Sequence, residues 1–212
     1  DHPINFNSMT LSRLAGVHFA TTAAVSLTNK VNPKLCSLTI KNIDISNMGL
    51  RASNGGCIKV HGIQDVTLES VVLRNCSAEL GGGISFFESR NLIIKKTSFY
   101  TNDAVNGGAI FIYKSKNISV TDSVFVNNKA KNVGGAFAVD IIGSLTISGC
   151  NFTKNEAYDS FGGALSLVRV LYTATLQSNA FLSNRAVFGS ALAMAAVHRS
   201  SITQNTFTSN IA

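Results

Sequence analysis

The sequence predicts an all-β protein, a single-stranded right-handed parallel β-helix of about seven coils of 26–28 residues. Three observations favour this fold. A Gly-rich step recurs along the chain, a short apolar segment recurs between the steps, and a large apolar residue follows each segment at a constant offset. One such unit is too small to bury its own apolar positions, whereas stacked units bury them in one continuous core.

The Gly-rich step marks one point in each coil, and its copies lie 26, 26, 27, 28 and 27 residues apart. They read GGCI at 55, GGGI at 81, GGAI at 107, GGAF at 134, GGAL at 162 and the degraded GSAL at 189. Paired glycines are expected where the backbone needs positive φ or where neighbouring coils approach closely. The step lacks the patterns of phosphate-binding loops, so we interpret it as a structural turn.

A strand-like segment, called here the LTI segment, recurs seven times: LTI at 38, VTL at 66, LII at 92, ISV at 118, LTI at 145, ATL at 174 and SSI at 200. These segments alternate with period two and are rich in β-branched residues, which predicts about three short strands per unit and not an α-helical repeat. Pairing each strand in parallel with its equivalent gives a parallel coil, and the usual hand of parallel crossovers makes it right-handed.

Three columns are predicted after the LTI segment. Five residues after its last letter stand Ile45, Leu73, Phe99, Phe125, Phe152, Phe181 and Phe207; three further stand Met48, Cys76, Asn102, Asn128, Asn155, Asn184 and Asn210; two further stand Leu50, Ala78, Ala104, Ala130, Ala157, Ala186 and Ala212. We expect the rings to stack inside the coil at about 4.8 Å. We expect the amides to hydrogen-bond to the coils above and below, and the alanines to occupy a crowded corner.

Residues 1–37 match the repeat poorly and are predicted to form an N-terminal cap or an irregular first coil with a loop, whereas residues 38–212 form the repeats. LAGVHF at 14–19 is interpreted as a worn Gly step. The last coil has no evident cap, and exposed solenoid ends aggregate, so we expect a segment of a longer chain.

Composition limits the kinds of partner. The net charge of +7 is spread along the chain without the basic cluster of a nucleic-acid-binding arm, and no apolar stretch approaches the 18 residues of a membrane span. The cysteines have no C-x-x-C spacing, which argues against zinc, and the pairing of Cys36, Cys57, Cys76 and Cys150 stays open. Sequons at Asn75, Asn117 and Asn151 are candidate glycosylation sites at about the number expected by chance.

The paired tetrapeptides GGA[ILV] and FxxN resemble the repeats of the polymorphic outer membrane proteins of chlamydiae, which are surface autotransporters with a β-helix passenger. The FxxN form is complete in five coils, from Phe99/Asn102 to Phe207/Asn210. Similar repeats occur in surface proteins of other organisms, including protists. The resemblance implies an extracellular or cell-surface protein with adhesin-like contacts. The chain shows neither the C-terminal membrane barrel nor the signal peptide of that family.

An enzyme is not expected, because β-helix enzymes that act on polysaccharides need converging carboxylates. Asp103 and Glu156 share a column, but Lys129 lies between them and Arg185 follows, which predicts a mixed-charge stripe. The four histidines are isolated in sequence. We therefore assign no catalytic residue, no metal ligand and no cofactor.

The strand after the Gly step, called here the Gly-step strand, presents an apolar outer face. Alternation sends Phe111 outward in one column, and it sends Phe87, Tyr113 and Val168 outward in the column two residues further along each strand. An outward stripe of this kind is unusual for a solvated face and predicts contact with a protein partner or a neighbouring subunit, unless long loops of the chain cover it. Basic residues expected to gather at the turn into the LTI strand would attract an anionic glycan: Arg90, Lys95, Lys96, Lys114 and Lys116.

These observations predict a non-enzymatic extracellular scaffold that makes protein or cell-surface contacts. Two alternatives stay open at this point. One is part of a polysaccharide-acting β-helix enzyme, and the other is a subunit of an extracellular filament.

Overall fold

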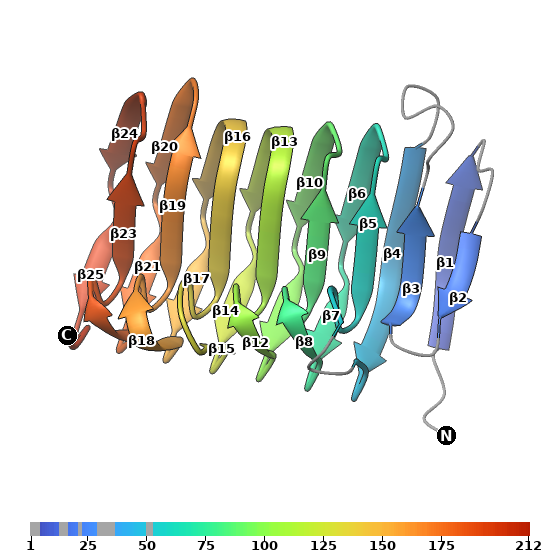
Figure 1. Cartoon of the computed structure of the whole chain (residues 1–212), viewed down its shortest axis with the longest axis horizontal. Coiled ribbons are helices and arrows are strands. Elements are labelled where there is room, and N and C mark those ends of the chain that lie inside the picture. Colours follow the sequence, from blue (N-terminus) through green and yellow to red (C-terminus); the bar gives the residue numbers. More distant parts are fainter. Residues whose placement is uncertain (1–4, 13–16, 21–22, 29–36, 50–52) are drawn as a thin grey trace.

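The computed structural model describes residues 5–12, 17–20, 23–28, 37–49 and 53–212, with side chains from residue 37 onward. Every regular element in these ranges is a β-strand. Figure 1 shows the strands stacked in successive coils along one axis, with β1 and β25 at opposite ends. The all-β, right-handed parallel solenoid predicted from the sequence is confirmed.

Five of the coils have four strands each, one more than the sequence predicts. The LTI strands are β4 (Ser37–Ser46), β6 (Asp65–Glu69), β10 (Asn91–Lys95), β20 (Thr173–Gln177), β24 (Arg199–Thr203) and the second halves of β13 (Ile110–Thr121) and β16 (Phe137–Ser148). The second strands are the end of β4, β7 (Val72–Arg74), β11 (Ser98–Tyr100), β14 (Val124–Val126), β17 (Asn151–Thr153), β21 (Ala180–Leu182) and β25 (Thr206–Thr208).

The additional strand carries the alanine column and forms a sheet of its own: β8 (Ser77–Leu80), β12 (Asp103–Asn106), β15 (Lys129–Ala130), β18 (Glu156–Phe161) and β22 (Arg185–Phe188). The Gly-step strands are β3 (Ala23–Thr28), β5 (Ile58–His61), β9 (Ile84–Phe87), β19 (Leu165–Val170), β23 (Leu192–Ala195) and the first halves of β13 and β16. The chain turns between the two halves of β13 and of β16 at Lys114 (φ 50°) and Ile141 (φ 56°).

The core contains the predicted stack of rings. Phe99, Phe125 and Phe152 are completely buried, and their successive ring centroids lie 4.7 Å apart with the planes nearly parallel. Phe181 and Phe207 continue the stack at 5.0 and 4.8 Å. Each of the four buried rings contributes about 1.5–3 kcal/mol through burial of its apolar surface, whereas Phe207 at the end of the stack is about half exposed.

The predicted asparagine column is a continuous hydrogen-bond ladder. In Asn128, Oδ1 accepts from the backbone N–H and from Nδ2 of Asn102, both at 3.0 Å. Its Nδ2 donates to the Phe99 carbonyl and to Oδ1 of Asn155, again at 3.0 Å. The same pattern links Asn155, Asn184 and Asn210. The ladder therefore ties successive coils together from Asn102 to Asn210.

A second ladder lies at the corner after the LTI strand, where the sequence indicated none. Here the backbone N–H of Thr97 donates to Ser123 Oγ at 3.2 Å, and that of Cys150 donates to Asn179 Oδ1 at 2.9 Å. Asn205 then takes the place next to Asn179. Five residue types fill equivalent places in this column, at Val71, Thr97, Ser123, Cys150 and Asn179, so no repeated letter revealed it.

The two glycines of the Gly-rich step serve different needs, and both were expected. The first has positive φ, as at Gly134 (62°). The second lies against the next coil, because a Cβ on Gly135 would stand 2.2 Å from the Gly163 carbonyl oxygen. No side chain fits at that distance.

The N-terminal strands pair differently from the repeats. β1 (Asn5–Ser12) runs antiparallel to β4, and β2 (Val17–Ala20) runs antiparallel to β3. β3 pairs in parallel with β5, so β3 and not residues 14–19 supplies the Gly-step strand of this coil. Residues 17–19 of the predicted worn Gly step lie in the antiparallel strand β2 and therefore do not continue the parallel coil, whereas residues 14–16 lie outside the described residues.

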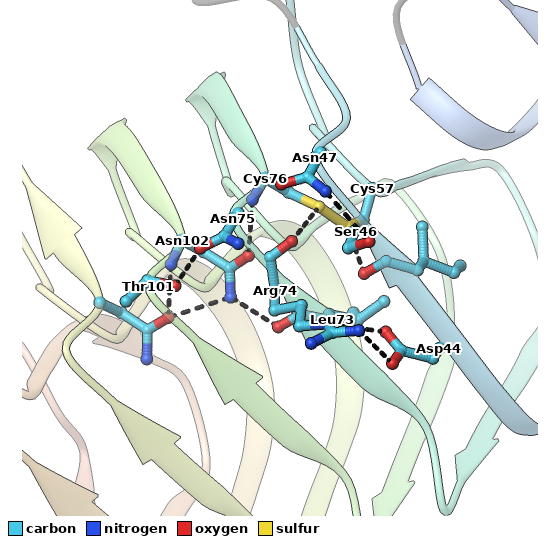
Figure 2. The surroundings of a disulfide bond; sticks show 12 residues. Asp44, Ser46, Asn47, Cys57, Leu73, Arg74, Asn75, Cys76, Thr101 and Asn102 are labelled. Carbon is cyan, nitrogen blue, oxygen red and sulfur yellow. Dashed lines mark hydrogen bonds and ion pairs between the residues drawn. A yellow bond between two sulfur atoms is a disulfide. The ribbon is translucent and has the colours of Figure 1, made fainter. Parts of the chain in front are cut away.

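A disulfide joins Cys57 and Cys76, and Figure 2 shows it at the corner where the asparagine ladder ends. Cys76 takes the ladder position next to Asn102, whose Oδ1 accepts from the Cys76 N–H at 3.1 Å. Both cysteines are buried. Cys150 is free and buried, and burial raises the pKa of its thiol to about 12. Cys36 lies outside the described residues.

Candidate interaction surface

The outer face of the Gly-step strands, the Gly-step face, carries two columns of outward side chains. The strand register aligns Ser85, Phe111, Ala138, Ser166 and Ala193 in the first column. It aligns His61, Phe87, Tyr113, Asp140, Val168 and Ala195 in the second. The four residues predicted to contact a partner therefore lie on one face, and all four are half-buried.

Three of the four form an aromatic cluster. The Phe87 ring centroid lies 5.7 Å from that of Phe111 and 6.2 Å from that of Tyr113, with tilted planes. Lys114 Nζ lies 5.1 Å from the Tyr113 centroid and 3.9 Å from Glu88 Oε1. The cluster is rigid because each ring stands on a strand that is paired on both sides.

Val168 is separated from the aromatic cluster by an ion pair, which the sequence did not indicate. Asp140 stands between Tyr113 and Val168 in the column, and Arg169 binds its carboxylate with two hydrogen bonds. The carboxylate holds the pKa of the Arg169 guanidinium above its usual value. The apolar stripe is thus divided at Asp140.

Beyond Asp140 the face is hollowed into a shallow apolar groove of about 260 Å³. Its lining includes Val133, Phe161, Ser166, Val168, Ala193 and Ala195. Phe161 and Phe188 border this region as a stacked pair with centroids 5.3 Å apart, and both rings are about half exposed. Sequence reasoning missed them because they fall in the variable loop, although both directly precede a Gly-rich step.

The five basic residues do not form one group. Lys116 and Arg90 are neighbours, since the Lys116 N–H donates to the Arg90 carbonyl, and Lys114 lies at the adjacent corner. Lys95 and Lys96 lie at the opposite end of β10. About five residues of extended strand, each rising about 3.3 Å, separate the two groups. The expectation of a single basic cluster is therefore wrong.

A larger groove of about 450 Å³ lies on the outer face of the LTI strands. Its edge is a ladder of polar side chains: Asn91 Nδ2 donates to Asp65 Oδ1 at 2.6 Å, and Asn117 Nδ2 donates to Asn91 Oδ1 at 2.9 Å. The sequon residue Asn117 thus lines this groove. The other two sequon residues, Asn75 and Asn151, are exposed on other parts of the coil.

Several acidic side chains lie beside bases or amides. The register Asp103, Lys129, Glu156, Arg185 confirms the predicted mixed-charge stripe on the alanine-column sheet. Elsewhere Asp44 pairs with Arg74 and Glu69 with Lys41. Among the residues that the structure describes, no three His, Cys, Asp or Glu side chains are grouped to hold a metal ion.

In the described part of the chain, no helix is long and apolar enough to cross a membrane.

Comparison with known proteins identifies the fold family. A family model described as a right-handed β-helix region matches residues 7–158. Searches of curated proteins and of solved structures each returned no match. The matched region covers more than half of the 212 residues and includes the coils that carry Phe87, Phe111 and Tyr113. The chain therefore belongs to the right-handed β-helix family.

Proposed function

We propose that the chain is a non-enzymatic extracellular scaffold that makes adhesin-like contacts with another protein through its Gly-step face. The observation that carries the proposal is the cluster of Phe87, Phe111 and Tyr113, three partly exposed rings held on a rigid parallel sheet. Aromatic side chains are enriched at the centres of protein interfaces, because they bury large areas at low conformational cost.

The distribution of charge supports a binding role over a catalytic one. Paired carboxylates with separated pKa values are the usual mark of a hydrolytic site. Here the carboxylates of Asp44, Glu69 and Asp140 each form an ion pair with a lysine or an arginine. We propose on this basis that the described coils carry no hydrolytic centre.

The disulfide supports an extracellular location, because disulfides persist mainly in oxidising compartments. The resemblance of the GGA[ILV] and FxxN repeats to chlamydial polymorphic outer membrane proteins agrees with a surface role. Glycosylation at the exposed Asn75 and Asn151 is compatible with the same location.

One observation favours a second candidate function. The groove on the LTI face, with the ladder from Asp65 to Asn117, offers amide and carboxylate groups at the spacing of adjacent strands. Such a groove could hold a glycan chain, either as a ligand of the scaffold or as a substrate if catalytic groups come from elsewhere.

The proposal is tested with beads coated with the purified chain on surfaces of fibronectin, collagen, laminin and cultured epithelial cells. Replacing Phe111 and Tyr113 with Ser should abolish bead adhesion. Tyr100→Ser is the matched control, because Tyr100 is an exposed aromatic residue on the second strand of the same coil. Adhesion should survive that change.

Adhesion by the double variant at the wild-type level would exclude the Gly-step face as the contact surface. Incubation with neutral and anionic polysaccharides tests the enzymatic alternative directly. New reducing ends or unsaturated products would overturn the non-enzymatic assignment.

A further inference from the structure

The Gly-step face is divided into two complementary halves by the coil that contains Asp140. On the N-terminal side, three of the four outward positions on β9 and β13 hold the large residues Phe87, Phe111 and Tyr113, and the fourth holds Ser85, which is completely buried. On the C-terminal side, the equivalent positions hold the small residues Ser166, Val168, Ala193 and Ala195, which line the apolar groove. Figure 1 shows β5, β9, β13, β16, β19 and β23, which contribute to this face, in successive coils.

We propose that the partner of the Gly-step face is a second copy of the chain, bound about a two-fold axis that runs along the first half of β16. This inference rests on the proposed function, which assigns protein contacts to the same face. A two-fold interface must be self-complementary, because the same patch supplies both sides.

The two-fold operation fixes which residues meet. Rotation about an axis along the β16 strand turns one face onto the other and reverses the order of the coils. The coil before β16 then lies opposite the coil after it. Phe111 therefore faces Ser166 of the second copy, Tyr113 faces its Val168, and Phe87 faces its Ala195. Each large residue meets a small one, and the pairing occurs twice.

The groove is suited to receive the rings. Its volume of about 260 Å³ accommodates a phenylalanine side chain, and Phe161 with Val133 supplies apolar walls beside the Ser166 floor. A face-to-face arrangement in the other sense, with coils in parallel order, would place the aromatic clusters against each other and leave both grooves empty. The order of large and small residues along the face thus favours the arrangement in which the coil order is reversed.

The axis passes through a neutralised charge. Asp140 of one copy meets Asp140 of the other, and each carboxylate is bound by two hydrogen bonds from its own Arg169. Side-chain exposures of 26% for Asp140 and 52% for Arg169 leave the guanidinium free to reach the second carboxylate as well. Two like charges at the axis are therefore tolerated.

The interface is small. Five coils at about 4.8 Å and strands of four residues at about 3.3 Å span a face of roughly 25 by 13 Å. Interfaces that bury less than about 1,200 Å² in total are weak or transient. We expect dissociation constants of about 100 μM for the isolated chain, and many copies on one surface would strengthen such contacts through avidity.

The test exchanges the large and the small residue of one predicted pair. Sedimentation equilibrium from about 10 μM to 1 mM should show a monomer–dimer equilibrium for the wild-type chain. Phe111→Ser should weaken it at least tenfold by removing the ring, and Ser166→Phe should weaken it at least tenfold by filling the groove. The double variant Phe111→Ser/Ser166→Phe should restore dissociation to within about threefold of wild type, because each new ring faces a new small residue.

Tyr100→Ser serves as the control on another face and should leave the equilibrium unchanged. Circular dichroism and thermal unfolding confirm that each variant is folded. A wild-type chain that is monomeric at 1 mM, or a double variant that associates no better than the single ones, would overturn the inference. If the chain is monomeric and its beads still adhere in a Phe111-dependent way, the inference fails and the proposed function stands. A chain that dimerises but whose beads do not adhere would support the inference and contradict the adhesin-like function.

Discussion

Asn128→Ala tests the idea that the asparagine ladder holds adjacent coils together. Asn128 is completely buried and uses all four hydrogen-bonding capacities of its amide. The alanine variant leaves the backbone N–H of Asn102 without its acceptor, and the Phe99 carbonyl loses one donor. Asn102 Nδ2 keeps the Leu73 carbonyl as an acceptor at 3.0 Å, so the side chain of Asn102 is only partly affected.

The expected loss of stability follows from these lost hydrogen bonds. One orphaned buried N–H costs about 1–3 kcal/mol, and each partial loss adds about 0.5–1 kcal/mol. We therefore expect the free energy of unfolding to fall by about 3 kcal/mol, measured by urea denaturation followed by far-UV circular dichroism. The matched control is Asn210→Ala at the end of the ladder, where the amide is only partly buried and water can replace it. Its cost should be about 1 kcal/mol.

A fall of less than about 0.5 kcal/mol for Asn128→Ala would refute the reasoning, because an orphaned buried N–H cannot be that inexpensive. Equal costs for the two variants would also contradict it. In that case the stability of the coil would depend on the packing of the rings and not on the ladder.

Three further changes probe other parts of the coil. Ser85 is completely buried, and its hydroxyl has no hydrogen-bond partner among the described residues. Ser85→Ala should therefore raise the free energy of unfolding by about 1 kcal/mol in thermal unfolding, and a loss of stability would show that the hydroxyl is satisfied. Replacing Cys57 and Cys76 with Ser should lower it by about 3 kcal/mol, given the separation of 19 residues, and reduction of the wild-type protein should reproduce this loss in urea denaturation. Burial raises the pKa of the Cys150 thiol to about 12. The folded protein should therefore lose stability as the pH rises from about 9, where the unfolded thiol ionises, to 12. Cys150→Ser should remove this contribution from the pH dependence of the unfolding midpoint.

Sequence reasoning predicted the interior because every coil places the same demand on equivalent residues. Phe125 must fill the same space as Phe99, and Asn128 must satisfy the same kind of backbone group as Asn102. Equivalent positions therefore carry the same residue type, and the fixed spacing between them reveals the column. The second glycine of the step is the clearest case, since a Cβ at Gly135 would stand 2.2 Å from a carbonyl oxygen.

The second ladder escaped prediction because the corner after the LTI strand specifies a chemical property and not one residue. Thr97, Ser123 and Asn179 each accept a hydrogen bond from the neighbouring coil. Cys150 stands in the same column, and its thiol lies near the carbonyls of Ser148 and Val120. A short polar side chain suffices at this corner, so the letters vary.

The basic residues show why surface groups are harder to predict. Arg90 and Lys95 are near in sequence, yet an extended strand carries them about 16 Å apart at about 3.3 Å per residue. Arg90 and Lys116 are distant in sequence but lie on adjacent coils about 4.8 Å apart. Proximity on a solenoid follows the column and not the chain, so a cluster must be counted within one column.

Strand alternation alone did not predict how much of the Gly-step face is exposed. Ser85 and Ala138 point outward in the first column, yet they are 0% and 2% exposed because larger neighbours in the adjacent coils cover them. An outward apolar column is therefore partly closed by its own members, and only the ring edges and the hollow around Ser166 remain for a partner. The order of large and small residues along the solenoid axis, more than their apolar content, then determines which surface can bind here.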